Sequence, residues 1–281
     1  MEPRIEAGVR VEEALALARP EGWTWTPRSV ARVLAMQPDG AFTARDAQGA
    51  PLGIVTCVVW DKLAWIGSMV VATHARRRGV ARALLRRAIA HAEERGATSI
   101  GADATREARP LYEGEGFVPT WGESALWTRE GAPRAQPPPT SAWAIYPVSP
   151  AEIMELLAYD APRFGAGRGR HLAHLMGEEP HRSFVAVHRK SGAFEGHGFA
   201  HERGIGPLVA DAPESAAQLL RALETARAPP RAIVPAWNPR AEALFAAAGY
   251  TKGRARLRMV RGAPLPGRPE AVYAVGAWAL G

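Results

Sequence analysis

The clearest chemistry in this sequence lies in one short basic turn and the residue after it. It reads Arg76-Arg77-Arg78-Gly79-Val80-Ala81, followed by Arg82. The apolar, β-branched segment 65–71 predicts a buried strand before the turn, and the helical spacing of apolar residues over 80–89 predicts a helix after it. A helix N-terminus carries unpaired backbone N–H groups and a partial positive charge, and arginines add charge-assisted donors. The sequence therefore predicts a phosphate or diphosphate site here.

The turn resembles the diphosphate-binding turn of the GNAT acetyltransferase superfamily, Arg/Gln-x-x-Gly-x-Gly/Ala, matched by Arg76, Gly79 and Ala81. The resemblance implies acetyl-CoA (coenzyme A) as co-substrate, with residues 76–82 binding its diphosphate. In GNAT enzymes the backbone of a splayed strand aligns the pantetheine arm. The residues that match this strand are Met69, Val70 and Val71. An ordinary strand-to-helix turn with solvated arginines is the alternative interpretation.

A second motif strengthens the resemblance. Leu111-Tyr112 followed by Gly116-Phe117 matches the GNAT signature, in which a helix end and glycines turn the chain back into a strand. The resemblance gives Tyr112 the role of acid, because its hydroxyl can donate a proton to the departing coenzyme A thiolate. The alternative is a tyrosine that only packs.

Acetyl transfer to an amine also requires a base, because an alkyl ammonium with a pKa of about 10.4 is almost fully protonated at pH 7. Asp103, at the end of a predicted strand beside the expected cofactor site, is our first choice. Capping the next helix, or pairing with Arg106 or Arg109, is an equally good interpretation of Asp103. No covalent enzyme intermediate is needed if the amine attacks the thioester directly.

Four residues are predicted to line the acceptor pocket. Trp23 and Trp25 lie in the loop where GNAT proteins often build that pocket, with core packing as the alternative. Asp160 and Phe164 could approach the same cleft from the second half of the chain. Asp160 could hold a cationic acceptor, and a solvated loop carboxylate is the alternative.

The elements expected around these residues follow the order β-α-α-β-β-β-α-β-α-β. Thr26 is a predicted N-cap, with Pro27 at the first helical position. The later elements of the first half are a hairpin at 40–45 and 52–60, a strand at 63–71, a helix at 79–94, a strand at 98–104, a helix at 106–113 and a strand pair over 117–127. This order resembles the GNAT fold, an α/β (α+β) arrangement with a mixed, mostly antiparallel sheet flanked by helices.

The second half reads as a divergent internal repeat of the first. Its strand at 206–210 and helix at 213–226 match the strand and helix around the basic turn, but Asp211 and Glu214 replace arginine and glycine there. Carboxylates at this place would repel a diphosphate. The whole chain resembles bacterial tandem GNAT proteins with an active first domain and a degenerate second one. Its expected parts are an acetyl-CoA-binding domain at 1–130, a Pro-rich linker at 131–142 and a degenerate domain with a C-terminal tail at 143–281.

Bulk composition excludes few classes of function. The formal net charge is +7, nearly all of it from arginine, which suits an anionic ligand such as coenzyme A. One cysteine, Cys57, lies in an apolar run, so no intramolecular disulfide can form and a cytoplasmic protein is expected. No metal-ligand spacing, signal peptide or membrane-spanning run is present, and we expect no metal and no membrane or nucleic-acid partner.

Together these observations predict an acyltransferase of the GNAT type. It would transfer the acetyl group of acetyl-CoA to a primary amine of a small molecule or peptide. The alternative is a catalytically inactive acyl-CoA-binding sensor or scaffold.

Overall fold

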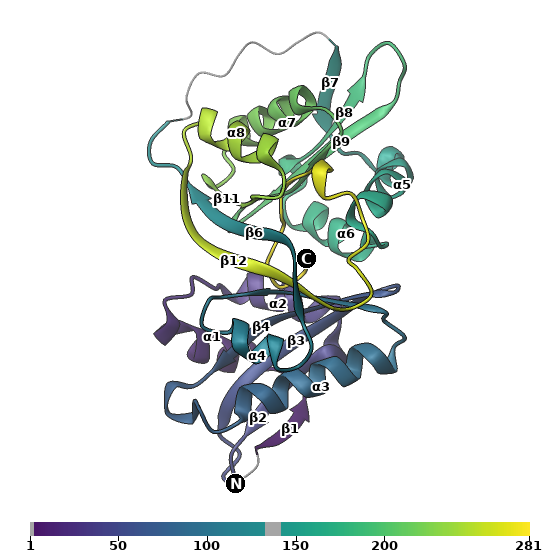
Figure 1. Cartoon of the computed structure of the whole chain (residues 1–281). Helices are drawn as coiled ribbons and strands as arrows, with labels where there is room; N and C mark the ends of the chain where they lie inside the picture. Colours follow the sequence, from purple (N-terminus) through teal and green to yellow (C-terminus); the bar gives the residue numbers. More distant parts are fainter. Residues whose placement is uncertain (1–2, 133–141) are drawn as a thin grey trace. The chain divides into compact units, whose positions relative to one another are not determined.

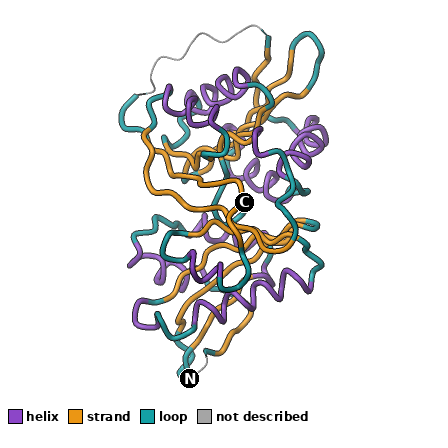
Figure 2. Tube along the Cα trace, in the orientation of Figure 1, coloured by secondary structure: helices purple, strands orange, loops and turns teal. Residues whose placement is uncertain are grey.

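The computed structural model describes residues 3–132 and 142–281. The predicted linker at 131–142 lies almost entirely outside these residues. The described chain forms two compact units, which Figure 1 shows as ribbons and Figure 2 by type of secondary structure. Each unit is a sheet with helices packed against it.

Each unit is built from segments that are far apart in the sequence. The first unit holds the chain through Val118, together with Met259–Leu265 and Ala279–Gly281. The second holds Pro119–Arg258 and Pro266–Trp278. Residues 119–130, which the sequence assigned to the first half, therefore belong to the second unit. The reason is that the strand after Val118 pairs with a strand of the second unit.

The sheet of the first unit has the order β1-β2-β3-β4-β5, and the end of β12 then continues it beside β5. Its own strands are β1 (Arg4–Ala7), β2 (Ala41–Arg45), β3 (Pro51–Trp60), β4 (Leu63–Val71) and β5 (Ser99–Ala104). The pairs through β4 are antiparallel, whereas β4 and β5 are parallel. A parallel pair needs a crossover, and α3 (Val80–Glu94) provides it.

Helices cover both faces of this sheet. α1 (Val11–Ala18) and α2 (Pro27–Met36) pack against Ile54 and Val70 on one face. α3 lies on the other face, near Phe42 and Gly53 (Figure 1). Along α3 the buried residues recur at helical spacing, as predicted: Val80, Leu84, Leu85, Ala88, Ile89, His91 and Ala92. The short α4 (Arg109–Glu113) follows β5.

Local signals in the sequence account for most of these boundaries. The predicted N-cap of α2 is confirmed, since Thr26 accepts from the Ser29 backbone N–H at 3.0 Å and Ser29 accepts from that of Thr26 at 2.9 Å. The predicted strand pair over 117–127 is wrong. The chain forms one strand there, β6 (Val118–Thr128), because positive φ angles at Trp121 (56°) and Gly122 (115°) only bend it.

The second unit repeats the layered arrangement. Its sheet runs β12-β6-β11-β10-β9-β8-β7, with β13 also paired to β10. The strands are β7 (Trp143–Pro147), β8 (Ser183–His188), β9 (Phe194–His201), β10 (Gly204–Ala210), β11 (Arg231–Pro235), β12 (Thr251–Gly262) and β13 (Val272–Ala274). α5 (Ile153–Phe164) and α6 (Gly169–Glu178) cover one face, over Val185 and Phe199. α7 (Pro213–Thr225) and α8 (Pro239–Ala247) cover the other, over Ala186 and Ala200.

The β4–β5 pair depends on a glycine beneath a tryptophan. Trp65 and Gly101 are register partners, and a Cβ on Gly101 would lie 2.1 Å from the Trp65 ring. We predict that Gly101→Ala lowers the free energy of unfolding by about 1–3 kcal/mol through overpacking. Urea unfolding followed by tryptophan fluorescence measures it. Gly177→Ala, on α6 with no atom within 4 Å of the new methyl, is the control and should not destabilise; equal midpoints for the two variants would contradict the prediction.

Candidate active site

β4 and β5 diverge to form a fork in the first unit. Their parallel ladder has its last pair at Ile66 and Ala102 among the described residues. β4 continues for five residues beyond it, to Val71, and β5 continues to Ala104. The backbone of β4 beyond Ile66 therefore faces the fork without a β5 partner. Unpaired strand edges of this kind bind extended, amide-bearing ligands by completing the ladder.

A β-bulge explains why the ladder ends there. Gly67 pairs with Thr56 and Val70 pairs with Ile54, so Ser68 and Met69 together oppose one residue of β3. Ser68 has a φ of 52°, in the left-handed region. A bulge bends its strand and increases the local twist. The bend separates β4 from β5, and the predicted residues Met69, Val70 and Val71 lie on the separated part.

The N-terminus of α3 lies shortly after the end of β4 in the chain. Gly79 is the N-cap with a φ of 83°, and the cap has no side-chain hydrogen bond. No acidic residue occupies the first turn, which begins with Val80, Ala81 and Arg82. The first N–H groups of a helix have no partner within the helix, and here no side chain caps them. This first turn can therefore bind an anion through its backbone.

The four arginines of the turn are not equivalent. Arg76 donates through Nε to the carbonyl oxygen of Val71 at 3.2 Å and pairs with Glu21. Arg82 pairs with Glu115 at 3.3 Å. Arg77 and Arg78 are exposed, and Arg77 has a positive φ of 62°. All four arginines are exposed, and Arg76 holds the turn against β4.

Trp23 and Trp25 lie between α1 and α2, close to the fork. Their ring centroids are 4.8 Å apart, and both rings pack against the cluster that contains Ile54 and Val70 of the sheet. Glu21, which pairs with Arg76, lies two residues before Trp23. The two tryptophans are half-buried, so part of each side chain packs on the core and part stays exposed.

Tyr112 lies in α4, after β5. Its side chain is buried (4% exposed) and packs edge-to-face on Phe117 with ring centroids 5.3 Å apart. The ring is therefore fixed by the turn that follows it. The predicted role of its hydroxyl as an acid stays a prediction.

Asp103 is the first residue of β5 beyond the ladder, which puts it on the β5 arm of the fork. It is buried (7% exposed). Arg109, one of its predicted partners, donates to Glu113 of its own helix at 2.7 Å. A buried carboxylate at the fork suits a base, and that role also stays a prediction.

In the second unit, β13 occupies the place that corresponds to the fork of the first unit. β10 pairs with β11 only at Ile205 and Ala232 among the described residues, so these strands also diverge early. β13 then pairs with β10 through Leu208 and Val209, and Val275 bridges to Ile233 of β11. The backbone edge that is open in the first unit is thus hydrogen-bonded to β13 here.

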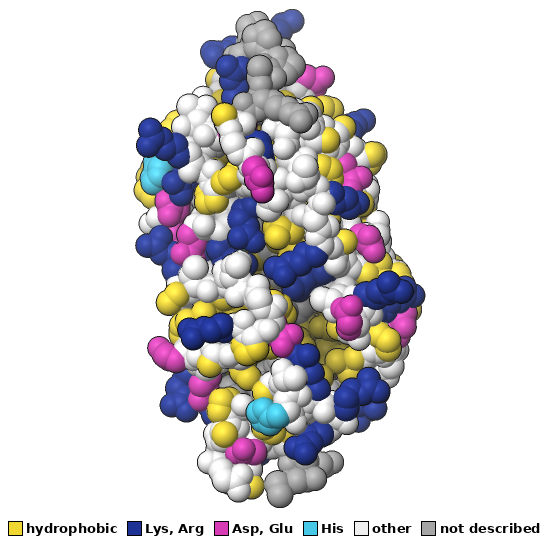
Figure 3. All heavy atoms as spheres, turned by 90° about the vertical axis from the view of Figure 1, so that its left-hand side faces the viewer, with side chains coloured by type: hydrophobic (Ala, Val, Ile, Leu, Met, Phe, Trp, Pro, Cys, Tyr) yellow, Lys and Arg dark blue, Asp and Glu magenta, His cyan; other side chains and the backbone are white. Residues whose placement is uncertain are grey.

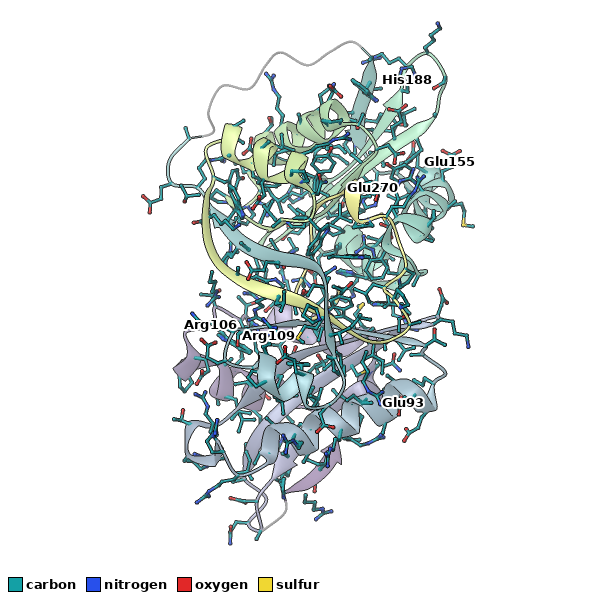
Figure 4. All side chains as sticks on the ribbon, viewed as in Figure 1. Glu93, Arg106, Arg109, Glu155, His188 and Glu270 are labelled. Atoms are coloured by element: carbon teal, nitrogen blue, oxygen red, sulfur yellow. The ribbon has the colours of Figure 1, made fainter. Side chains whose placement is uncertain are left out.

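Asn238 fastens this segment. Its side-chain amide donates to the carbonyl oxygens of Glu270 and Val272 at 3.0 and 2.9 Å, and its Oδ1 caps α8 by accepting from the Arg240 N–H. Figure 4 labels Glu270, which begins the stretch that Asn238 holds. Asn238 therefore holds the segment that leads into β13.

The helix that corresponds to α3 also differs. α7 has Pro213 at its start, which removes one N–H donor, and Glu214 in its first turn. Asp211 precedes it and forms a two-pronged ion pair with Arg163. The N–H donor that Pro213 lacks and the negative charge of Glu214 both oppose binding of an anion at this helix.

Asp160 and Phe164 belong to a buried network in the second unit. The Asp160 carboxylate is 1% exposed and accepts two hydrogen bonds from Arg168 and one from His197, all at 2.8 Å. The Arg168 guanidinium stacks over Phe164, 4.1 Å from the ring centroid. Both oxygens of Asp160 already accept from protein groups. Its predicted contact with a cationic acceptor would require this network to open.

Burial and charge set the pKa values in this network. Burial alone would raise the pKa of Asp160, but Arg168 and His197 outweigh it and hold that pKa well below its usual value. Burial lowers the pKa of His197, and this outweighs the opposing effect of Asp160. The trio therefore holds an ionised Asp160 and a neutral His197 that donates to it.

Sequence reasoning missed three residues at the fork. Gly67 and Ser68 make the bulge, and no local pattern marks a bulge inside an apolar strand. Thr56, the partner of Gly67, has a buried hydroxyl with no hydrogen-bond partner in the described structure. A threonine in a β-branched run is typical of any strand, so only the three-dimensional pairing draws attention to it.

The described residues do not support a thiolate nucleophile or a metal site. Cys57 is fully buried, which raises the pKa of its thiol to about 12, so it is not a thiolate nucleophile. Within residues 3–132 and 142–281, no cluster of three or more His, Cys, Asp or Glu side chains could hold a metal ion. Across those residues, no helix has both the length and the apolar character needed to cross a membrane.

Comparison with known proteins identifies the family. Residues 10–117 match the model of the acetyltransferase (GNAT) family, and residues 156–274 match that of an acetyltransferase (GNAT) domain. No curated protein matches. The two matches cover most of the chain, and it belongs to the GNAT acetyltransferases as a tandem of two GNAT domains.

Solved structures share the fold along the whole chain. A candidate acetyltransferase from Pyrococcus horikoshii is 23% identical with a TM-score of 0.84, covering 100% of this chain and 96% of its own. A GCN5-related N-acetyltransferase from Sphaerobacter thermophilus is 15% identical with a TM-score of 0.67, covering 94% and 96%. A tandem GNAT protein from the clavulanic acid biosynthesis pathway is 14% identical with a TM-score of 0.61, covering 92% and 98%.

The buried network of Asp160, Arg168 and His197 predicts that the free energy of unfolding depends on pH. His197 is neutral in the fold but protonates in the unfolded chain below its usual pKa of about 6.5, so stability is lost as the pH falls below that value, by at most about 1.4 kcal/mol per pH unit. We expect His197→Gln to weaken this dependence between pH 7.5 and 5.5 in urea unfolding. His91, whose pKa is also lowered by burial, still contributes to the pH dependence of stability in this variant. The exposed His181→Gln is the control; identical slopes for both variants would refute the assignment.

Proposed function

We propose that the protein is an N-acetyltransferase that uses acetyl-CoA and acetylates a primary amine of a small molecule or peptide. One observation carries the proposal: in the first unit an open strand edge leads into a helix N-terminus without a side-chain cap. These two features accept the two polar parts of coenzyme A, the amide-bearing arm and the diphosphate. Membership of the GNAT acetyltransferases supports acetyl transfer in general.

In this proposal each part of the first unit has one task. Residues 76–82 hold the diphosphate, and Met69–Val71 align the arm by backbone hydrogen bonds. Tyr112 donates a proton to the coenzyme A thiolate as it leaves. Asp103 takes one proton from the ammonium, so that the free amine attacks the thioester carbonyl directly. The C–S bond then breaks, and the second proton lost from nitrogen restores the Tyr112 hydroxyl, which leaves the amide and the free thiol.

The same proposal treats the second domain as degenerate. Its strand edge is covered by β13, and Asp211 and Glu214 bring negative charge where a diphosphate would bind. We therefore expect one acetyl-CoA site per chain. Trp23 and Trp25 are the proposed acceptor wall. A cytoplasmic location, expected from the single cysteine, is part of the proposal.

Two other classes of function are weaker. An inactive acyl-CoA-binding sensor would share the cofactor site, and only turnover separates it from an enzyme. A nucleic-acid binder would need a basic surface. On the face drawn in Figure 3, lysine and arginine side chains are interspersed with acidic and apolar ones.

Calorimetric titration with acetyl-CoA is the first experiment. We expect one site per chain in the wild type and binding at least about tenfold weaker in Gly79→Glu, because a carboxylate at the first turn repels the diphosphate. Gly49→Glu is a matched control, since both glycines have a φ of +83° and no atom within 4 Å of a new Cβ. Two sites would mean that the second domain also binds the cofactor, and no binding would refute the proposal.

Replacement of Tyr112 tests the chemistry. Tyr112→Phe keeps the edge-to-face contact with Phe117 and removes only the hydroxyl. We expect turnover to fall about 10²–10⁴-fold if the hydroxyl is the acid, with acetyl-CoA affinity unchanged. Steady-state kinetics with a panel of amines measures it. Unchanged turnover would remove that role from Tyr112.

A further inference from the structure

Three residues near the end of the chain lie in the first unit, at the point where the fork begins. We call Ala279–Gly281 the tail segment. A Cβ built on Gly67 would lie 2.4 Å from the Cα of Ala279 and 2.9 Å from its carbonyl oxygen. Only a glycine at 67 permits this approach. Leu280 is 1% exposed and Gly281 is also buried, so the tail segment is packed into the unit.

The strand pairing shows which face the tail segment covers. Gly67 is the register partner of Thr56, so both face the same side of the sheet. Thr56 and Ile54 share a face because alternate residues of a strand point the same way. Ile54 packs with residues of α1 and α2. The tail segment therefore covers the start of the fork on the α1–α2 face, where the unpaired hydroxyl of Thr56 is also buried.

This position is where the far end of a bound cofactor would lie. A ligand whose diphosphate sits at the first turn of α3 extends its arm back along β4, from Val71 toward Gly67. At about 3.3 Å per residue this stretch is about 13 Å long. The group at the end of the arm, which in an acyl-CoA is the acyl group, then reaches the start of the fork beside Gly67 and Ala279.

We propose that the tail segment forms the wall of the acyl pocket and restricts the co-substrate to short-chain acyl-CoA. This inference rests on the proposed function and adds a specificity determinant to it. Ala279 fills the space over Gly67, and Leu280 holds the segment in place by its burial. A longer acyl chain would collide with this wall, whereas coenzyme A without an acyl group would not reach it.

Calorimetry with coenzyme A, acetyl-CoA and butyryl-CoA tests the wall. The wild type should bind butyryl-CoA at least about tenfold more weakly than acetyl-CoA, since methylenes that do not fit a pocket cost about 10-fold or more. Ala279→Gly, Leu280→Ala and a chain ending at Trp278 should each reduce that ratio, the last most of all, and leave the affinity for coenzyme A unchanged. Ala277→Gly removes the same methyl two residues earlier and should keep the wild-type ratio.

The outcomes separate the two proposals. A ratio that stays at its wild-type value in all three variants, while coenzyme A still binds, overturns the wall and leaves the proposed function standing. Wild-type protein that binds no coenzyme A overturns the proposed function and the wall with it. Thermal melting of each variant confirms that it is folded, and Ala279→Gly keeps the test valid if the variants that remove Leu280 unfold.

Discussion

The early end of the β4–β5 ladder is the constraint on which the site depends. Two parallel strands must be joined by a crossover, and α3 is that crossover, so its N-terminus follows closely on the end of β4. The bulge at Ser68 then separates the strands before either one ends. An open backbone edge and a helix N-terminus without a side-chain cap are thus two results of one topology, and together they suit the extended anionic ligand that we propose.

The second unit has the same topology with a different result. β10 and β11 diverge as early as β4 and β5 do, but β13 completes the ladder and Asn238 fastens it. An open ladder in a protein interior leaves N–H and C=O groups without partners, which is costly. In the second unit the chain's own strand, β13, supplies partners for these groups. The fold there therefore needs neither a ligand nor a basic turn to complete the ladder.

Much of the fold could be predicted because its signals are local. The N-cap at Thr26, the apolar spacing along α3 and the order of strands in the first half each depend on residues close together in the sequence. The bulge, the pairing of β6 with β11 and the insertion of β13 depend on partners far apart in the chain. No periodicity reports such pairing. The expected strand pair over 117–127 was wrong because the positive φ angles at Trp121 and Gly122 bend one strand without ending it.

The side chains were harder to interpret than the backbone, and the buried trio shows why. Asp160 has the residue type expected of a ligand for an amine, yet Arg168 and His197 already donate three hydrogen bonds to it inside the second unit. In the first unit the features that suit a cofactor are the backbone of β4 without a β5 partner and the α3 N-terminus without a side-chain cap, which any residue type can supply. A glycine, Gly67, is informative there only because Ala279 lies against it. The site is therefore defined by which backbone groups the fold leaves unpaired, and the basic turn marks only one end of it.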